Sequence, residues 1–237
     1  MNPVHFVTSL TLTASKHDLP SDGFASNQVQ MMGLLAAMAI IPFAIMMLTS
    51  FSKIVVVLSI VRSALGTQQA PPTMVITGLA AVLSVTVMTP TFEKMYAAGR
   101  AGWVEGADAT SLMSQSAAVL MPLKDFLVKH GSAEERARFV DMARELRPVE
   151  ESDLVGEQDL SVIVPAFVIT ELKEALIIGF LLFLPFLVLD MLIANVLLAL
   201  GMQTLSPSQV SLPFKILLFV AVDGWALLSK GLILGYR

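Results

Sequence analysis

The chain has 237 residues, of which 55% are hydrophobic and 14% are charged, whereas soluble domains carry about 25% charged residues. A mean hydropathy of +0.76 indicates an integral membrane protein, or one whose surface is buried in partners. The net charge of −4 argues against nucleic acid as a partner. The lack of cysteine excludes a disulfide framework and thiol chemistry.

The amino-terminal part begins with a polar stretch and continues into two apolar ones. Residues 1–30 are mixed in polarity and predict a flexible or partner-bound tail. Residues 31–52 and 73–92 carry almost no charge and are long enough to span a bilayer. Lys53 and Arg62 flank the short first loop, which places that loop in the cytoplasm, and a helix before it should end near Gly66.

A charged insert follows at residues 93–159, which hold most of the charges of the chain. Its composition predicts a solvated, helical segment on the outer, periplasmic side. One helix should run from Met121 to His130, with Pro122 in its first turn. A second should open with the capping box of Ser132 and Glu135 and continue to Arg147.

The rest of the chain is apolar and repeatedly interrupted. Two spans are predicted, at about 175–200 and 212–233. Pro185, Gly201, Pro207 and Pro213 lie in this part and are residues that kink or end helices. The interruptions, together with Asp190 and Lys215, indicate backbone that packs on other protein or lines a cavity. The sequence thus predicts an all-α membrane-type fold, divided into a tail (1–30), an apolar helical hairpin (31–92), a charged helical insert (93–159) and a second apolar hairpin (160–237).

Three groups of motifs resemble one known family when taken in order and spacing. The first is LTSFSKI at 48–54 with RSALGTQQAPP at 62–72. The second is PAF at 165–167, ELK at 171–173, IGF at 178–180 and FLPFLVLD at 183–190. The third is ALGM at 199–202, SLPFK at 211–215 and DGW at 223–225. This set resembles the FliP/SctR family, the export-gate protein of flagellar and injectisome type III secretion, over about 31–92 and 160–237.

The resemblance implies a core export subunit in the bacterial inner membrane, and not an enzyme. Copies would assemble into a ring-like, helically staggered gate, expected to be a pentamer, that lies largely on the periplasmic side and passes unfolded proteins. The implied partners are FliQ/SctS-like and FliR/SctT-like gate subunits, an FlhB/SctU-like switch protein, inner rod, needle or flagellar rod proteins, and unfolded export substrates. No cofactor is implied.

The loop after Gly201 is the predicted constriction of the export channel. Many members of the family have a methionine-rich loop there, whereas residues 201–207 contain only Met202 as a methionine. The alternative is a tight turn between helices with Met202 in a core. This departure, and the lack of a clear signal peptide in residues 1–30, favour the injectisome branch over the flagellar one. The predicted gate loop comprises Gly201, Met202, Gln203, Thr204 and Leu205.

The charges within the apolar segments are predicted to pair between subunits, because an unpaired charge is costly in a dry environment. An alternative for 171–174 is a helix cap at the membrane surface. The predicted pairing residues are Lys53, Arg62, Glu171, Lys173, Glu174, Asp190 and Lys215.

Two other functions compete with the export gate. A proton-coupled transporter would use Glu171, Asp190, Lys215 and Asp223 as relay groups. An intramembrane aspartyl protease would need Asp190 and Asp223 as its catalytic pair. The three histidines, His5, His17 and His130, lie outside the apolar segments and far apart in sequence, which predicts solvated side chains and no metal site.

Overall fold

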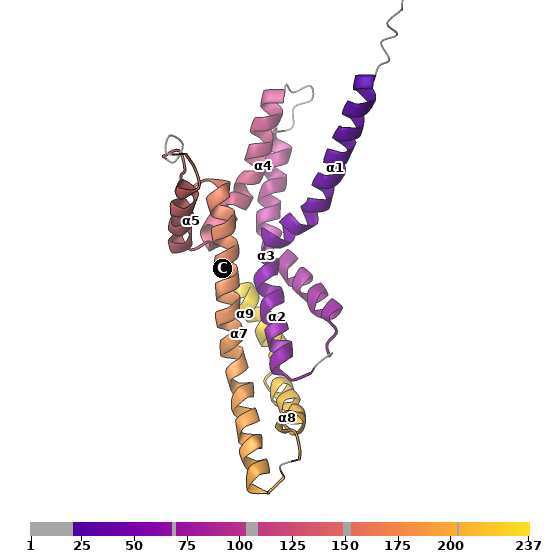
Figure 1. Cartoon of the computed structure of the whole chain (residues 1–237), viewed down its shortest axis with the longest axis vertical. Coiled ribbons are helices and arrows are strands. Elements are labelled where there is room, and N and C mark those ends of the chain that lie inside the picture. Colours follow the sequence, from indigo (N-terminus) through magenta and orange to yellow (C-terminus); the bar gives the residue numbers. More distant parts are fainter. Residues whose placement is uncertain (1–20, 68–69, 103–108, 149–152, 203) are drawn as a thin grey trace, which may run out of the picture. The chain divides into compact units, whose positions relative to one another are not determined.

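A computed structural model describes residues 21–67, 70–102, 109–148, 153–202 and 204–237, and every regular element in these ranges is a helix (Figure 1). The predicted all-α class is thereby confirmed. The chain divides into two compact units, Met1–Phe43 and Ala44–Arg237. Most of α1 (Ser21–Met47) belongs to the first unit, and its described side chains are largely exposed.

The second unit is built on α7 (Leu160–Ala199), a helix of 40 residues. Apart from the charged residues at 171, 173, 174 and 190 it is apolar on all sides, which is typical of a membrane span or a helix covered by other protein. Helix α2 (Phe51–Ala64) packs along α7, and α8 (Pro207–Ala221) and α9 (Gly224–Leu234) lie beside the same two helices (Figure 1).

Of the remaining helices of this unit, α4 (Ala109–His130) and α5 (Ala133–Glu145) pack against the amino-terminal half of α7. Helix α3 (Thr73–Gly102) packs against α2 and α4. The short helix α5 packs on α7 through a small cluster of Val140, Val155 and Val162.

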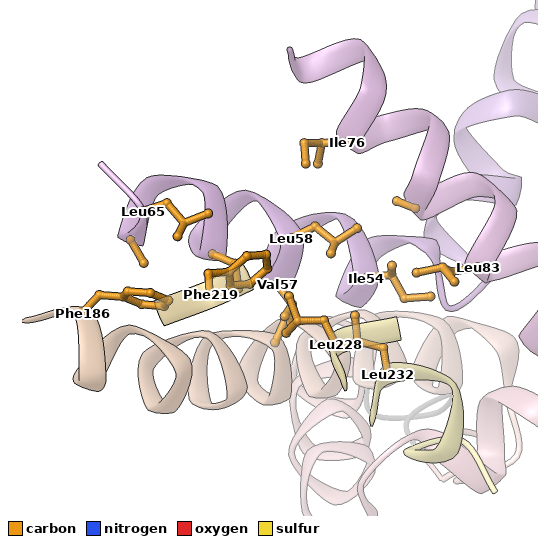
Figure 2. Close-up of a cluster of buried hydrophobic side chains, with 14 residues drawn as sticks. Ile54, Val57, Leu58, Leu65, Ile76, Leu83, Phe186, Phe219, Leu228 and Leu232 are labelled. Carbon is orange, nitrogen blue, oxygen red and sulfur yellow. The ribbon is translucent and has the colours of Figure 1, made fainter. Parts of the chain in front are cut away.

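The largest core cluster lies on one face of α2. Ile54, Val57, Leu58 and Val61 follow the spacing of a helical stripe and are almost fully buried. They face side chains from α3, α7, α8 and α9, and Figure 2 shows Phe219 and Leu228 between α2 and α7 and Ile76 on the other side of α2. Gly179 of α7 permits the close approach, because a Cβ there would lie 2.4 Å from Cδ1 of Ile60.

Several predicted boundaries in the first half of the chain are wrong. Residues between the first two spans form the buried helix α2 rather than a loop, although Gly66, with φ of +74°, does end it as predicted. Helix α3 continues through Pro90 to Gly102. Helix α4 begins at Ala109 rather than Met121, so Pro122 lies inside it.

Two further expectations for local structure also need correction. Ser132 is the N-cap of α5, but its side chain makes no capping hydrogen bond, and the helix ends at Glu145 rather than Arg147. The backbone N–H of Ser132 donates instead to Oγ1 of Thr170, at 3.0 Å. Pro185 and Pro213 lie inside α7 and α8 without ending them. Packing against neighbouring helices outweighs the tendency of these two prolines to break a helix.

Two helical segments of the described chain, Thr73–Ala101 and Leu160–Ala199, are long and apolar enough to cross a membrane. The number rises to four if each interrupted pair, Met31–Met47 with Phe51–Ala64 and Pro207–Ala221 with Gly224–Leu234, counts as one span. The second pair bends by 60° at its break, where Asp223 has a φ of 51°. The helices therefore fit a membrane protein with interrupted spans.

Candidate functional site

A buried ion cluster joins α2 to α7. Nζ of Lys53 lies 3.0 Å from Oε1 of Glu171 and 2.6 Å from Oε2 of Glu174. The two glutamates are three residues apart on α7 and therefore share one face of that helix. Lys53 is 5% exposed and Glu171 is fully buried, whereas about half of the Glu174 side chain is exposed. The cluster thus holds a positive charge and a negative charge in the interior.

The carboxyl-terminal end of the described chain completes this cluster. The hydroxyl of Tyr236 donates a hydrogen bond to Oε2 of Glu171. Its ring lies 4.2 Å from Nζ of Lys53, within the range of a cation–π contact. The same ring stacks on Phe126 with 6.0 Å between centroids, so α2, α4, α7 and Tyr236 meet at one point.

His130 lies against this aromatic group. Its ring centroid is 4.7 Å from that of Phe126 and 5.0 Å from that of Tyr236. Burial, together with the positive charges of Lys129 and Lys53 and against the opposing effect of Glu174, lowers the pKa of His130 from 6.5 to about 4. His130 is therefore neutral at pH 7. The side chain of His130 is half-buried, so the prediction of a solvated side chain holds only in part for this histidine.

A second buried pair joins α8 to α7. Nζ of Lys215 lies 2.6 Å from Oδ2 of Asp190 and donates to the carbonyl oxygen of Ala64 at 3.1 Å. Ser211 donates to the other carboxylate oxygen of Asp190. Because Ala64 is the last residue of α2, Lys215 neutralises a carboxylate and also satisfies a free carbonyl at the end of a helix.

The other two predicted charges also find partners within the chain. Arg62 donates to Oγ1 of Thr73 at 2.8 Å. Nζ of Lys173 lies 3.6 Å from Oε1 of Glu135. All seven predicted pairing residues thus have polar partners in the same chain, although the sequence predicted partners in neighbouring subunits. Pairing between subunits is not needed to neutralise them and stays a prediction.

The predicted gate loop begins with a Schellman motif that ends α7. Gly201 has a φ of +71°, and its N–H donates to the carbonyl of Leu198 at 3.1 Å. The N–H of Met202 donates to the carbonyl of Leu197 at 2.9 Å, which completes the motif. Ser206 then occupies the N-cap position of α8, which starts at Pro207, without a capping hydrogen bond from its side chain. The turn is thus specified by a glycine at its start and a proline at its end.

The side chains of this loop point away from the core of the described chain. Met202 is 47% exposed and Leu205 is 46% exposed, and Thr204 is exposed as well. Gln203 lies outside the described residues. Met202 does not pack in the core of this chain, as the alternative had it. The described side chains of the loop are therefore accessible to another molecule.

The outer surface of α7 is apolar and largely uncovered. Most residues in its most apolar part are not buried within the chain. Large side chains along it, among them Leu176, Phe180 and Leu187, are exposed. Such a surface needs lipid or other protein to cover it. The described residues contain no group of three or more acidic or histidine side chains that could hold a metal ion.

The family model and the relatives that match this chain agree with one another, and each match covers most of the chain. Residues 34–232 match the model of the FliP family. The chain is 45% identical over 206 residues to the hypersensitivity response secretion protein HrcR of Ralstonia nicotianae, an alignment that covers 86% of this chain and 95% of that one. It is 40% identical over 210 residues to the Yop proteins translocation protein R of Yersinia pestis, covering 89% and 97%. It is also 40% identical over 215 residues to the flagellar biosynthetic protein FliP of Caulobacter vibrioides, covering 91% and 79%.

Proposed function

Because this chain belongs to the FliP family, we propose that it is a channel-forming subunit of a type III protein export gate. The observation that carries the proposal is the match over residues 34–232, which includes both buried ion clusters and the loop after α7. The relatives bear the names of secretion, translocation and flagellar biosynthetic proteins, and none of the three is named as an enzyme. The exposed apolar surface of α7 supports assembly with other subunits in the inner membrane.

Within this function we favour an injectisome over a flagellum. The support is the single methionine in the loop and the 45% identity to HrcR, although the Yop proteins translocation protein R matches no better than the flagellar relative, both at 40%. Deleting the gene in its own bacterium tests the choice with two readouts. We expect loss of injectisome secretion into the medium and unchanged swimming. Loss of swimming with normal secretion would assign the protein to the flagellum.

For the loop, we propose that residues 201–205 form the constriction of the channel. The exposed Met202 side chain supports this, because a thioether chain is apolar and deformable and can both seal a pore and yield to a passing polypeptide. Met202→Ala should increase dye leakage through the assembled gate without preventing assembly. Met74→Ala is the matched control, since Met74 is a highly exposed methionine outside the loop. Equal leakage from both variants would show that the loop does not form the constriction of the channel.

For the charges, we propose that the exposed members make the contacts between subunits. Glu174 and Lys173 have about half of their side-chain area accessible, whereas Lys53 and Glu171 are enclosed within the chain. Lys173→Glu should therefore weaken ring assembly in native gels while leaving the chain folded. If this variant still formed a complete ring, the charges would act within one chain and would not make the contacts between subunits.

The insert is proposed to lie on the periplasmic side, as the family implies. Loop charges do not support this placement, because Lys53 is buried in α2 and the positive-inside bias applies to loops. The placement therefore rests on the family alone. Thiol labelling of a cysteine in α5 from the periplasm tests it directly.

A further inference from the structure

A small polar cavity of about 220 Å³ lies between α3 and α4, next to Tyr236. Helix α3 lines it with Thr91 and Lys94, and α4 lines it with Asp125, Lys129 and His130, alongside apolar and proline side chains. The three charged residues are exposed, whereas Thr91 is only 9% exposed. The cavity thus has a charged rim and a buried polar residue at its base.

The hydroxyl of Thr91 is a nearly buried donor without a partner. Three other threonines of α3 each donate to the carbonyl oxygen four residues earlier: Thr77, Thr86 and Thr89. Thr91 makes no such bond, and no other hydrogen bond in the described part of the chain. A buried hydroxyl that stays unpaired costs free energy, so a ligand that accepts its hydrogen bond would be favoured in the cavity.

The charges at the rim favour an anion with a single negative charge. Lys94 and Lys129 outnumber Asp125. Because His130 is neutral at pH 7, the lining carries a net charge of +1. Lys94 forms no ion pair in the described part of the chain, and Lys129 only donates to the carbonyl oxygen of Arg237, at 3.5 Å. Both cations are therefore available to an anion in the cavity.

A carboxylate fits this site better than a phosphate group. A phosphate ester carries a charge of about −1.5 to −2 at pH 7. Its second charge would be opposed by Asp125 and by the negative end of the α4 dipole, since Lys129 and His130 lie in the last turn of α4. The volume of about 220 Å³ equals about seven water molecules of roughly 30 Å³ each. It therefore has room for the side chain of an aspartate or a glutamate.

The weakness of exposed ion pairs indicates where this carboxylate comes from. Such pairs contribute little free energy, so Lys94 and Lys129 would hold a free carboxylate only weakly. A carboxylate on a docked protein acts at a high effective concentration and can occupy a weak site. A neighbouring subunit therefore suits the cavity better than a small molecule in solution.

We propose that this cavity receives the carboxylate of an aspartate or glutamate side chain from a neighbouring protein chain. Lys94 and Lys129 would pair with the carboxylate at the rim, and the hydroxyl of Thr91 would donate to it at the base. The proposal rests on the proposed function, because it requires this chain to assemble with other subunits.

The chemistry of the cavity is tested on the full-length protein alone, in detergent micelles. The probe is sodium propionate, which reproduces the side chain of glutamate, added at constant pH and ionic strength. Binding is followed through the NMR signals of the His130 ring, which lines the cavity and is assigned with His130→Gln. We expect a saturable shift with propionate and none with propionamide, its uncharged analogue. No shift with propionate, an equal shift with propionamide, or tighter binding of inorganic phosphate would overturn the proposal.

Two pairs of variants test the residues that hold the carboxylate. Thr91→Val keeps the shape of the side chain and should raise the Kd for propionate about tenfold, as loss of a hydrogen bond to a charged group implies. Thr89→Val is its control, because Thr89 is exposed, lies on the same helix and does not line the cavity. Lys94→Gln should also raise the Kd, whereas Lys124→Gln removes the same charge outside the lining and should not. Equal Kd values within either pair would overturn the proposed site.

The source of the carboxylate is tested in the assembled gate with a carbodiimide. This reagent joins a lysine amine to a carboxylate in direct contact by forming an amide bond, and water is taken up by the carbodiimide. We expect a product larger than one chain on a denaturing gel, with Lys94 or Lys129 linked to an acidic residue in its mass spectrum. The product should be absent when Lys94→Gln and Lys129→Gln are combined.

The outcomes separate this proposal from the proposed function. A gate that assembles but gives no such product would overturn the assignment to a neighbouring chain, while the export function would stand. Propionate binding by the isolated protein would then identify a free carboxylate as the ligand. Absence of any complex would contradict the proposed function itself, and this proposal with it.

Discussion

Replacing Lys53 by methionine should strongly destabilise the protein. The substitution keeps an unbranched side chain of similar length but removes the cation 3.0 Å from Oε1 of Glu171. Glu171 is fully buried and would keep only the Tyr236 hydroxyl as a partner. Leaving one member of a buried ion pair uncompensated costs about 3–5 kcal/mol. We expect the free energy of unfolding to fall by this amount.

The assay is thermal unfolding in mild detergent, followed by circular dichroism. A loss of about 3–5 kcal/mol corresponds to a fall in Tm of about 10 °C for a chain of this size. Lys173→Met is the control, because Lys173 is 54% exposed in its pair with Glu135. Exposed pairs contribute about 0–1 kcal/mol, so its Tm should hardly change.

A double variant distinguishes an uncompensated charge from simple loss of packing. Lys53→Met combined with Glu171→Gln removes both buried charges and leaves an amide oxygen to accept from Tyr236. This variant should recover about 2 kcal/mol relative to Lys53→Met alone. Two results would refute an uncompensated buried charge as the cause: equal Tm values for Lys53→Met and Lys173→Met, or a double variant less stable than Lys53→Met.

Four further outcomes are expected. Lys215→Met should lower the free energy of unfolding by less than Lys53→Met, because the side chain of Asp190 is 30% exposed and can be hydrated once unpaired; an equal loss would contradict this. The pKa of His130, about 4 rather than 6.5, means that the folded chain binds fewer protons than the unfolded chain between these pH values. Its Tm should therefore fall from pH 6.5 to 4, and His130→Gln should flatten that profile. Gly201→Ala should cost about 1 kcal/mol because φ is +71°, measured by the same unfolding assay against Gly33→Ala, in open space. Glu134→Cys, the sole cysteine of the chain, should react with an impermeant thiol reagent from the periplasm, and labelling only after the inner membrane is ruptured would place the insert in the cytoplasm.

The class of fold and the helical character of each apolar segment could be predicted from the sequence. Long runs without charge, and turn residues such as Gly66 and Gly201, specify helices and their ends through local chemistry. The extents of the helices could not be predicted, because Pro122, Pro185 and Pro213 indicate helix ends or kinks in the sequence but lie inside helices in the structure. Packing by neighbouring helices decides whether a proline ends a helix, and that packing is not visible in local sequence.

The sequence predicted which charged residues need partners, but it did not predict which residues those partners are. The cost of an unpaired charge identifies Lys53, Glu171 and Lys215 as residues that need partners. Their partners depend on how α2, α7 and α8 pack, and the structure supplies them within one chain. The contribution of Tyr236 was missed. A terminal aromatic residue carries no local signal of the buried carboxylate that it meets.

The most direct test of the central claim is the mass of the protein complex. The chain should be expressed with the FliQ/SctS-like and FliR/SctT-like proteins that the proposed function calls for, extracted in mild detergent and measured by native mass spectrometry. If it is an export-gate subunit, the exposed surface of α7 is covered by neighbours, and the protein should be recovered in a large complex with several copies of itself and both partners. Recovery as a monomer or dimer, with both partners present and unbound, would contradict the assignment.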